Sequence, residues 1–133
     1  MANEYTLTID VDAPPDVAWS VVGDVTGVPR WFTKYVECTV DGDIRTLRSA
    51  EGAEIVERLL ERDDEAMTYA YTVIAGPPLK SHWASFTVTP RAGGSAIVWH
   101  TRAEFLDASI DTEERLAAGQ RAGLERLKAL CES

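Results

Sequence analysis

Three side chains of this sequence are suited to moving protons in a pocket: His100, Glu57 and Tyr71. Histidine has a reference pKa of about 6.5, so a nearby carboxylate can tune it for general acid–base chemistry. The alternative is a strand histidine that is hydrogen-bonded to Ser85 or to water and has no chemical role. The chain has no glycine-rich phosphate loop and no nucleophile elbow, so phosphoryl transfer and serine-type hydrolysis are not expected.

Metal and cofactor sites are not expected either. The sequence has two histidines and two cysteines. Cys38 and Cys131 lie far apart and lack the short spacing of metal ligands. We therefore predict no metal, no cofactor and two reduced thiols.

The N-terminal part of the chain predicts one strand and two short helices. Residues Tyr5 to Val11 alternate between apolar and polar side chains, which is typical of a half-buried strand. Pro14 and Pro15 suit the first turn of a helix, because an N–H at that position would have no partner. Residues 28–32, which include Trp31, predict a second short helical segment.

The rest of the chain predicts six strands followed by a long helix. The strands occupy residues 35–105 and are separated by turn signals at regular intervals, which indicates a series of hairpins. The signals are Asp41-Gly42-Asp43, Ser49 to Ala53, Asp63-Asp64-Glu65, Gly76-Pro77-Pro78 and Pro90 to Ser95. Asp111 stands three residues before Glu114, a capping pattern that predicts a helix start. The apolar stripe of this helix would contain Leu116, Leu124, Leu127 and Leu130.

This order predicts an α+β fold. Strands and helices that are segregated along a chain form an antiparallel sheet wrapped on one helix, not an alternating parallel fold. A length of 133 residues and the lack of any linker predict a single domain over residues 1–133.

Symmetric pairing about the turns places the candidate side chains in two rows across four strands. With turns centred on Asp64 and Pro78 and a third turn near Gly93, the first row holds Glu57, Tyr71, Ser85 and His100. The second row holds Ile55, Val73, Trp83 and Arg102. Opposed side chains lie about 5 Å apart, so the first row could carry a chain of hydrogen bonds, which a one-residue slip would break. Hydrophobicity alone does not indicate whether the face with these two rows is the inner one, because the other face of the predicted sheet is equally apolar.

The charge of the chain excludes several partners. A formal net charge of −9 repels phosphate backbones and anionic lipid surfaces, so nucleic acid is not expected as a partner.

No stretch approaches the ~20 apolar residues of a membrane span, so membrane insertion is not expected. The polar start MANEYT does not resemble a signal peptide, and we expect a cytoplasmic protein. A monomer and a homodimer both remain open.

Several local sequences, taken in order, form a recognisable pattern that covers nearly the whole chain. They are Ala13-Pro14-Pro15, Val17, Trp19, Asp24, Trp31-Phe32, Glu57-Arg58-Leu59, Asp63-Asp64-Glu65, Tyr69-Ala70-Tyr71, Gly76-Pro77-Pro78-Leu79, Ser95 to Trp99 and Gly123-Leu124. In this order they resemble the polyketide cyclase/dehydrase and lipid-transport family, a START-like, Bet v 1-like (SRPBCC) group with the helix-grip fold.

The resemblance implies an internal ligand cavity and assigns the two rows to its wall. In the similar plant abscisic-acid receptors, the cavity is lined by the residues that match six members of these rows: Glu57, Tyr71, Val73, Trp83, Ser85 and His100. His82 would then point outward. The residues expected to bind ligand are Trp31, Thr46, Arg48, Glu57, Tyr69, Tyr71, Val73, Trp83, Ser85, His100 and Arg102. Glu57, if buried, would pair with Arg48 or Arg102, because an isolated buried charge is costly.

Three functions follow from these observations. The first is binding or transport of a small hydrophobic ligand of the polyketide, lipid or isoprenoid kind. The second is a cyclase or dehydratase that moves protons with His100, Glu57 or Tyr71. The third is a protein-interaction module whose cavity is filled by side chains. We favour the binder, because the polar groups match no recognised catalytic constellation.

Overall fold

The computed structural model describes residues 3–133 and contains seven strands, two α-helices and one short 3-10 helix. In chain order, the elements are β1 (Glu4–Val11), α1 (Pro15–Val22), η1 (Val28–Arg30), β2 (Tyr35–Asp41), β3 (Ile44–Ser49), β4 (Glu54–Asp63), β5 (Thr68–Ala75), β6 (Leu79–Arg91), β7 (Gly94–Phe105) and α2 (Thr112–Glu132). The expected order of elements is therefore confirmed, and each strand boundary between residues 35 and 105 falls at a predicted turn.

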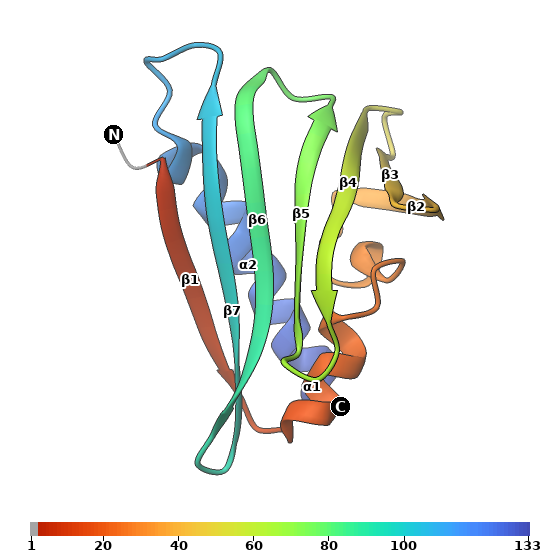
Figure 1. Cartoon of the computed structure of the whole chain (residues 1–133), viewed down its shortest axis with the longest axis vertical. Helices are drawn as coiled ribbons and strands as arrows, with labels where there is room; N and C mark the ends of the chain where they lie inside the picture. Colours follow the sequence, from red (N-terminus) through yellow and green to blue (C-terminus); the bar gives the residue numbers. More distant parts are fainter. Residues whose placement is uncertain (1–2) are drawn as a thin grey trace.

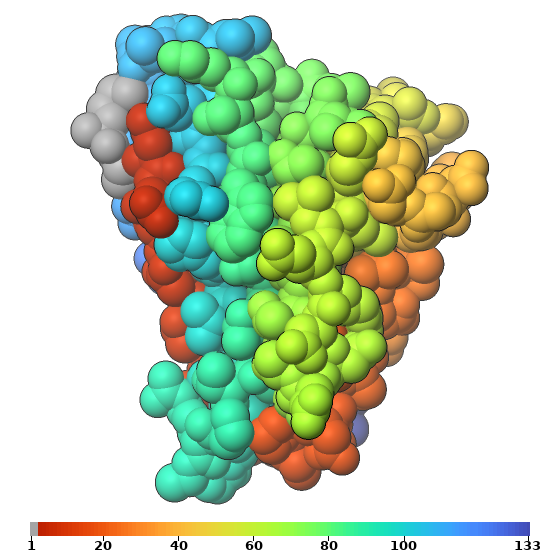
Figure 2. All heavy atoms as spheres, viewed as in Figure 1, coloured from red at the N-terminus to blue at the C-terminus, as the bar shows by residue number. Residues whose placement is uncertain are grey.

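All seven strands form one antiparallel sheet in the order β1-β7-β6-β5-β4-β3-β2. The sheet curves, and α2 crosses behind it in Figure 1, which gives the expected helix-grip architecture. Asp111 caps α2, because its side chain accepts a hydrogen bond from the backbone N–H of Glu114. The face turned toward α2 is called the inner face below. Figure 2 shows the opposite, outer face, which is formed by side chains of the strands.

The register between β6 and β7 is confirmed, and the register between β5 and β6 is wrong by one residue. Ser85 lies opposite His100, as predicted. Tyr71, however, lies opposite Ala84 and not opposite Ser85. Because side chains alternate between the two faces, this single step places Ser85 and His100 on the face opposite to Tyr71.

The pairing of β4 with β5 is also shifted, but without this consequence. Glu57 lies opposite Val73, two residues from the predicted partner Tyr71. A shift of two residues leaves every side chain on its original face. Glu57 and Tyr71 are therefore both on the inner face, as predicted.

A local interruption of the ladder between β5 and β6 explains the one-residue step. The paired residues end at Tyr71 and Ala84. Beyond them, the backbone N–H of Val73 donates to Nδ1 of His82 at 3.1 Å, in place of a backbone carbonyl. The turn that follows contains Pro77 and Pro78, which cannot donate ladder hydrogen bonds. Symmetric pairing about that turn therefore does not hold.

Several aromatic side chains pack together between the inner face and α2. The rings of Phe86 and Trp99 lie 4.5 Å apart between centroids, and Trp31 meets Trp99 edge-on at 5.5 Å. Trp31 also lies against Gly123 of α2, where an added Cβ would stand 3.2 Å from its ring. This packing anchors the segment after η1 between the sheet and the helix.

Candidate functional site: an internal cavity

A cavity of about 180 Å³ lies between the inner face and α2. Its walls are mainly apolar and include Phe32, Tyr35, Ile55, Val73, Trp99 and Phe105. The exposed residues Lys34, Pro77, Arg115 and Gly119 form its rim. A smaller lobe of about 40 Å³ shares part of this wall and extends toward Trp31, Arg45 and Glu57.

A buried ion pair borders the small lobe. Arg45 and Glu57 are opposed residues of β3 and β4, and their side chains are 2% and 7% exposed. Nε of Arg45 donates to Oε1 of Glu57 at 2.8 Å, and Nη2 lies 2.7 Å from the same oxygen. Burial raises the pKa of Glu57, and the adjacent Arg45 opposes that rise. The pair lies inside the core, and both of its contacts use one carboxylate oxygen of Glu57.

Two tyrosines extend this polar group. Nη1 of Arg45 donates to the backbone oxygen of Val25 at 3.1 Å and to the hydroxyl of Tyr69 at 3.4 Å. The hydroxyl of Tyr71 accepts from Nε1 of Trp99 at 3.1 Å. Burial raises the pKa of Tyr71 well above its ordinary value, so this hydroxyl remains protonated at neutral pH. Tyr71 is therefore available as a hydrogen-bond donor.

His82 lies on the cavity wall, although the sequence predicted that it would point outward. Its ring lies 5.5 Å from that of Tyr71. Burial lowers the pKa of His82 to about 4, so the ring is neutral at physiological pH. Because Nδ1 accepts the Val73 N–H, the proton of the neutral ring must be on Nε2.

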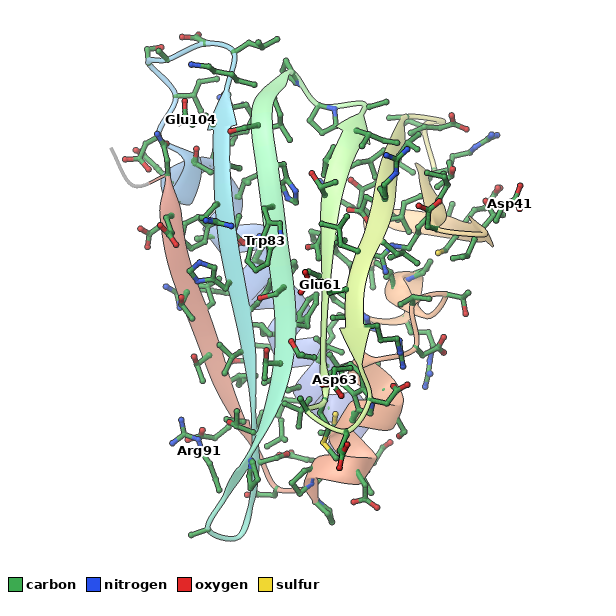
Figure 3. All side chains as sticks on the ribbon, in the orientation of Figure 1. Asp41, Glu61, Asp63, Trp83, Arg91 and Glu104 are labelled. Atoms are coloured by element: carbon green, nitrogen blue, oxygen red, sulfur yellow. The ribbon has the colours of Figure 1, made fainter. Side chains whose placement is uncertain are left out.

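The structure divides the predicted ligand-binding residues into two groups. Trp31, Glu57, Tyr71 and Val73 line the cavity or its small lobe, and Tyr69 lies directly behind them against Arg45. The prediction that the remaining residues face the cavity is wrong, because they lie on the outer face: Thr46, Arg48, Trp83, Ser85, His100 and Arg102. Figure 3 shows Trp83 on the side of the sheet away from α2.

On the outer face, part of this second group forms a cluster with β1. His100 bridges Thr6 Oγ1 at 2.7 Å and Glu4 Oε2 at 2.8 Å. The guanidinium of Arg102 lies 4.7 Å from the ring centre of Trp83. The predicted acid–base partnership of His100 with Glu57 is therefore wrong, since the two side chains are on opposite faces.

We expect His100→Ala to change stability slightly and cavity binding not at all. The substitution removes two partly exposed contacts between β1 and β7, which together stabilise the fold by up to about 1 kcal/mol. Urea unfolding measures the first effect, and calorimetric titration with a cavity ligand measures the second. A loss of ligand affinity of about tenfold or more would contradict the placement of His100 outside the cavity.

We did not predict from the sequence that Arg45 pairs with Glu57, although the turn between their strands indicates this pairing. Centring the turn at residues 49–53 on Glu51 places Arg45 directly opposite Glu57, as the structure has it. Arg48 instead pairs with Glu54 at 2.6 Å on the surface. His82 carried no comparable signal, because its inward position depends on the irregular end of the β5–β6 ladder.

Comparison with known proteins identifies the relatives of this chain. The sequence profile of the family described as "Polyketide cyclase / dehydrase and lipid transport" matches residues 3–132. Among curated proteins, none matches the sequence significantly. None of the helices between residues 3 and 133 combines the length and apolar character that a transmembrane span requires.

Several solved structures share the fold. The protein XoxI from Bacillus cereus is similar with a TM-score of 0.86 and 20% identity, over 95% of this chain and 93% of that one. An uncharacterized protein from Bacillus thuringiensis has a TM-score of 0.84 and 19% identity, over 95% and 96%. A protein from Thermobifida fusca has a TM-score of 0.78 and 26% identity, over 98% and 96%.

Proposed function

Because the chain belongs to the polyketide cyclase/dehydrase and lipid-transport family, we propose that it binds a small, largely apolar organic molecule in the cavity between the sheet and α2. The ligand would be of the polyketide, lipid or isoprenoid kind and small enough for a cavity of about 180 Å³. The observation that supports this proposal most directly is the cavity itself, with apolar walls and a few polar groups at one end. Ligand sites in proteins usually have this composition.

A cyclase or dehydratase is the second candidate, and the raised pKa of Glu57 favours it. A buried carboxyl group with a raised pKa is suited to proton transfer. Against this role, one oxygen of Glu57 is held by two contacts from Arg45. His82 is neutral at physiological pH and Tyr71 does not ionise there, so neither titrates near neutrality. Binding without catalysis is therefore the function that the geometry supports best.

Filling the cavity from α2 tests the proposal. A Cβ at Gly119 would meet only Phe32, at an ordinary 3.9 Å, so a larger side chain enters at the rim without backbone strain. Replacing glycine within a helix also favours folding by roughly 0.5–1 kcal/mol. We expect Gly119→Leu to remain folded and to bind toluene at least about tenfold more weakly than the wild type in calorimetric titrations. Toluene is a suitable probe because a cavity of about 150 Å³ accommodates benzene.

Ala118→Leu is the matched control. Ala118 is the exposed neighbour of Gly119 on the same helix and is not part of the cavity wall. It should keep the wild-type affinity. Equal affinities of the two variants would contradict the proposed location of the site, and native mass spectrometry of the freshly purified wild type would identify a natural ligand.

A further inference from the structure

We propose that the ligand is a neutral, single-ring molecule with one hydroxyl group, and that this hydroxyl binds in the small lobe between Trp31, Glu57 and Tyr71. The inference rests on the proposed function, because it requires that the cavity binds a ligand. The hydrogen-bonding groups, the charge and the shape of the site together indicate the chemical class of the ligand.

The first observation is an unpaired donor. Trp31 is 3% exposed, and its Nε1–H is the one buried side-chain polar atom without a partner among residues 3–133. Cε3 and Cζ3 of its ring lie against Gly123, so the N–H edge of the indole is on the side away from α2. Trp31 lines the small lobe. A buried donor without an acceptor costs about 1–3 kcal/mol, which an acceptor atom of a ligand would recover.

Two further groups border the same lobe. The hydroxyl of Tyr71 accepts from Trp99, and its own proton has no acceptor within the described part of the chain. Glu57 uses Oε1 for both contacts with Arg45, which leaves Oε2. The residues that line the lobe thus carry two donor hydrogens and one carboxylate oxygen without a partner in the described part of the chain. A hydroxyl group is complementary to this set, because it has one donor and two acceptor positions.

The charged residues beside the small lobe favour a neutral group there. The hydrogen bonds of the Arg45 guanidinium are internal, to Glu57, to Tyr69 and to the backbone of Val25. A carboxylate in the lobe would therefore face Glu57 while the guanidinium is already engaged, and an ammonium group would face Arg45. Burial of an unpaired charge costs several kcal/mol, so either ligand is disfavoured.

The shape of the cavity sets the size of the ligand. The small lobe of about 40 Å³ can hold a group the size of a water molecule, which occupies about 30 Å³ in the liquid. The larger lobe of about 180 Å³ is comparable with cavities of about 150 Å³ that bind benzene, and it is smaller than sites of about 300 Å³ or more for larger ligands. Phe32, Tyr35 and Trp99 in its wall favour an aromatic ring.

Calorimetric titration with phenol, toluene and benzoate tests the inference. We expect the wild type to bind phenol about tenfold more tightly than toluene, as expected for matched hydrogen bonds, and to bind benzoate more weakly than phenol. Trp31→Phe removes a donor that has no partner among residues 3–133, so it breaks no hydrogen bond within that range. In this variant, the ratio of the affinity for phenol to the affinity for toluene should fall about tenfold. Trp83→Phe, on the outer face, is the matched control and should keep the full preference.

The possible results separate this inference from the proposed function. Binding of toluene without a preference for phenol would overturn the hydroxyl assignment and leave the binding function intact. Tighter binding of benzoate than of phenol would overturn the neutral class. An unchanged preference in Trp31→Phe would overturn the assignment of the hydroxyl to the small lobe. Failure of all three probes to bind would overturn the proposed function and this inference together.

Discussion

We expect Arg45→Met to lower the free energy of unfolding by about 3–5 kcal/mol, the largest loss from one substitution at this site. The reason is that Glu57, whose side chain is 7% exposed, would retain a buried carboxyl group without its cation. Urea unfolding monitored by circular dichroism measures the change. The variant should regain part of the loss as the pH falls, because protonation of Glu57 removes the unpaired charge and the pKa of Glu57 is already raised by burial.

The same two strands offer a matched control. Arg48 and Glu54 also form a direct cross-strand pair between β3 and β4, but their side chains are 50% and 43% exposed. Exposed pairs contribute about 0–1 kcal/mol, so Arg48→Met should have a small effect. If Arg45→Met and Arg48→Met cost the same, the buried pair is not the energetic feature described above.

Replacing both members of the buried pair should be better tolerated than replacing Arg45 alone. The double variant Arg45→Met with Glu57→Leu leaves no buried charge, and apolar replacements of buried pairs are often neutral or stabilising. We therefore expect most of the stability to return. The preference for phenol over toluene should be weaker in this double variant than in the wild type, because Glu57 no longer provides an acceptor oxygen beside the small lobe.

His82 makes the stability of the protein depend on pH below neutrality. Burial lowers its pKa from 6.5 to about 4. The unfolded chain therefore takes up a proton at higher pH than the folded protein does. Above about pH 6.5, His82 is neutral in both states and does not oppose folding. As the pH falls from there toward about 4, the free energy of unfolding decreases by up to about 3 kcal/mol.

The difference between the wild type and His82→Asn isolates this effect. Asparagine retains an acceptor for the N–H of Val73 but does not titrate, so the stability of this variant should decrease less between about pH 6.5 and 4. Glu57 acts in the opposite sense, because a raised carboxyl pKa favours the folded state as the pH falls, but it is present in both proteins. An NMR titration of His82 that gives a pKa near 6.5 would contradict the buried, neutral ring.

The order of elements and every turn between residues 35 and 105 follow from the sequence, because turn residues and apolar periodicity act locally. The β6–β7 register follows as well, since the short turn at Ala92 and Gly93 constrains both strands symmetrically. Gly93 has a positive φ of 80°, which glycine adopts without strain. The pairing of Arg45 with Glu57 was also accessible from the turn between β3 and β4.

Only the tertiary structure decided which side chains face the cavity. With β5 and β6 out of register by one residue, the predicted rows mixed side chains of both faces, so composition could not identify the inner face. With the actual register, Tyr71, Phe86 and Trp99 lie on the inner face, and the outer face carries more polar side chains such as those of Ser85, His100 and Arg102. The β5–β6 ladder is interrupted where the His82 ring accepts the hydrogen bond of the Val73 N–H. Because the predicted register did not include this interruption, it assigned Ser85 and His100 to the inner face and His82 to the outer face, and the structure shows the reverse. Local sequence rules determine where strands begin and end, but a register depends on every hydrogen bond along the ladder, and a single residue of error reverses the face.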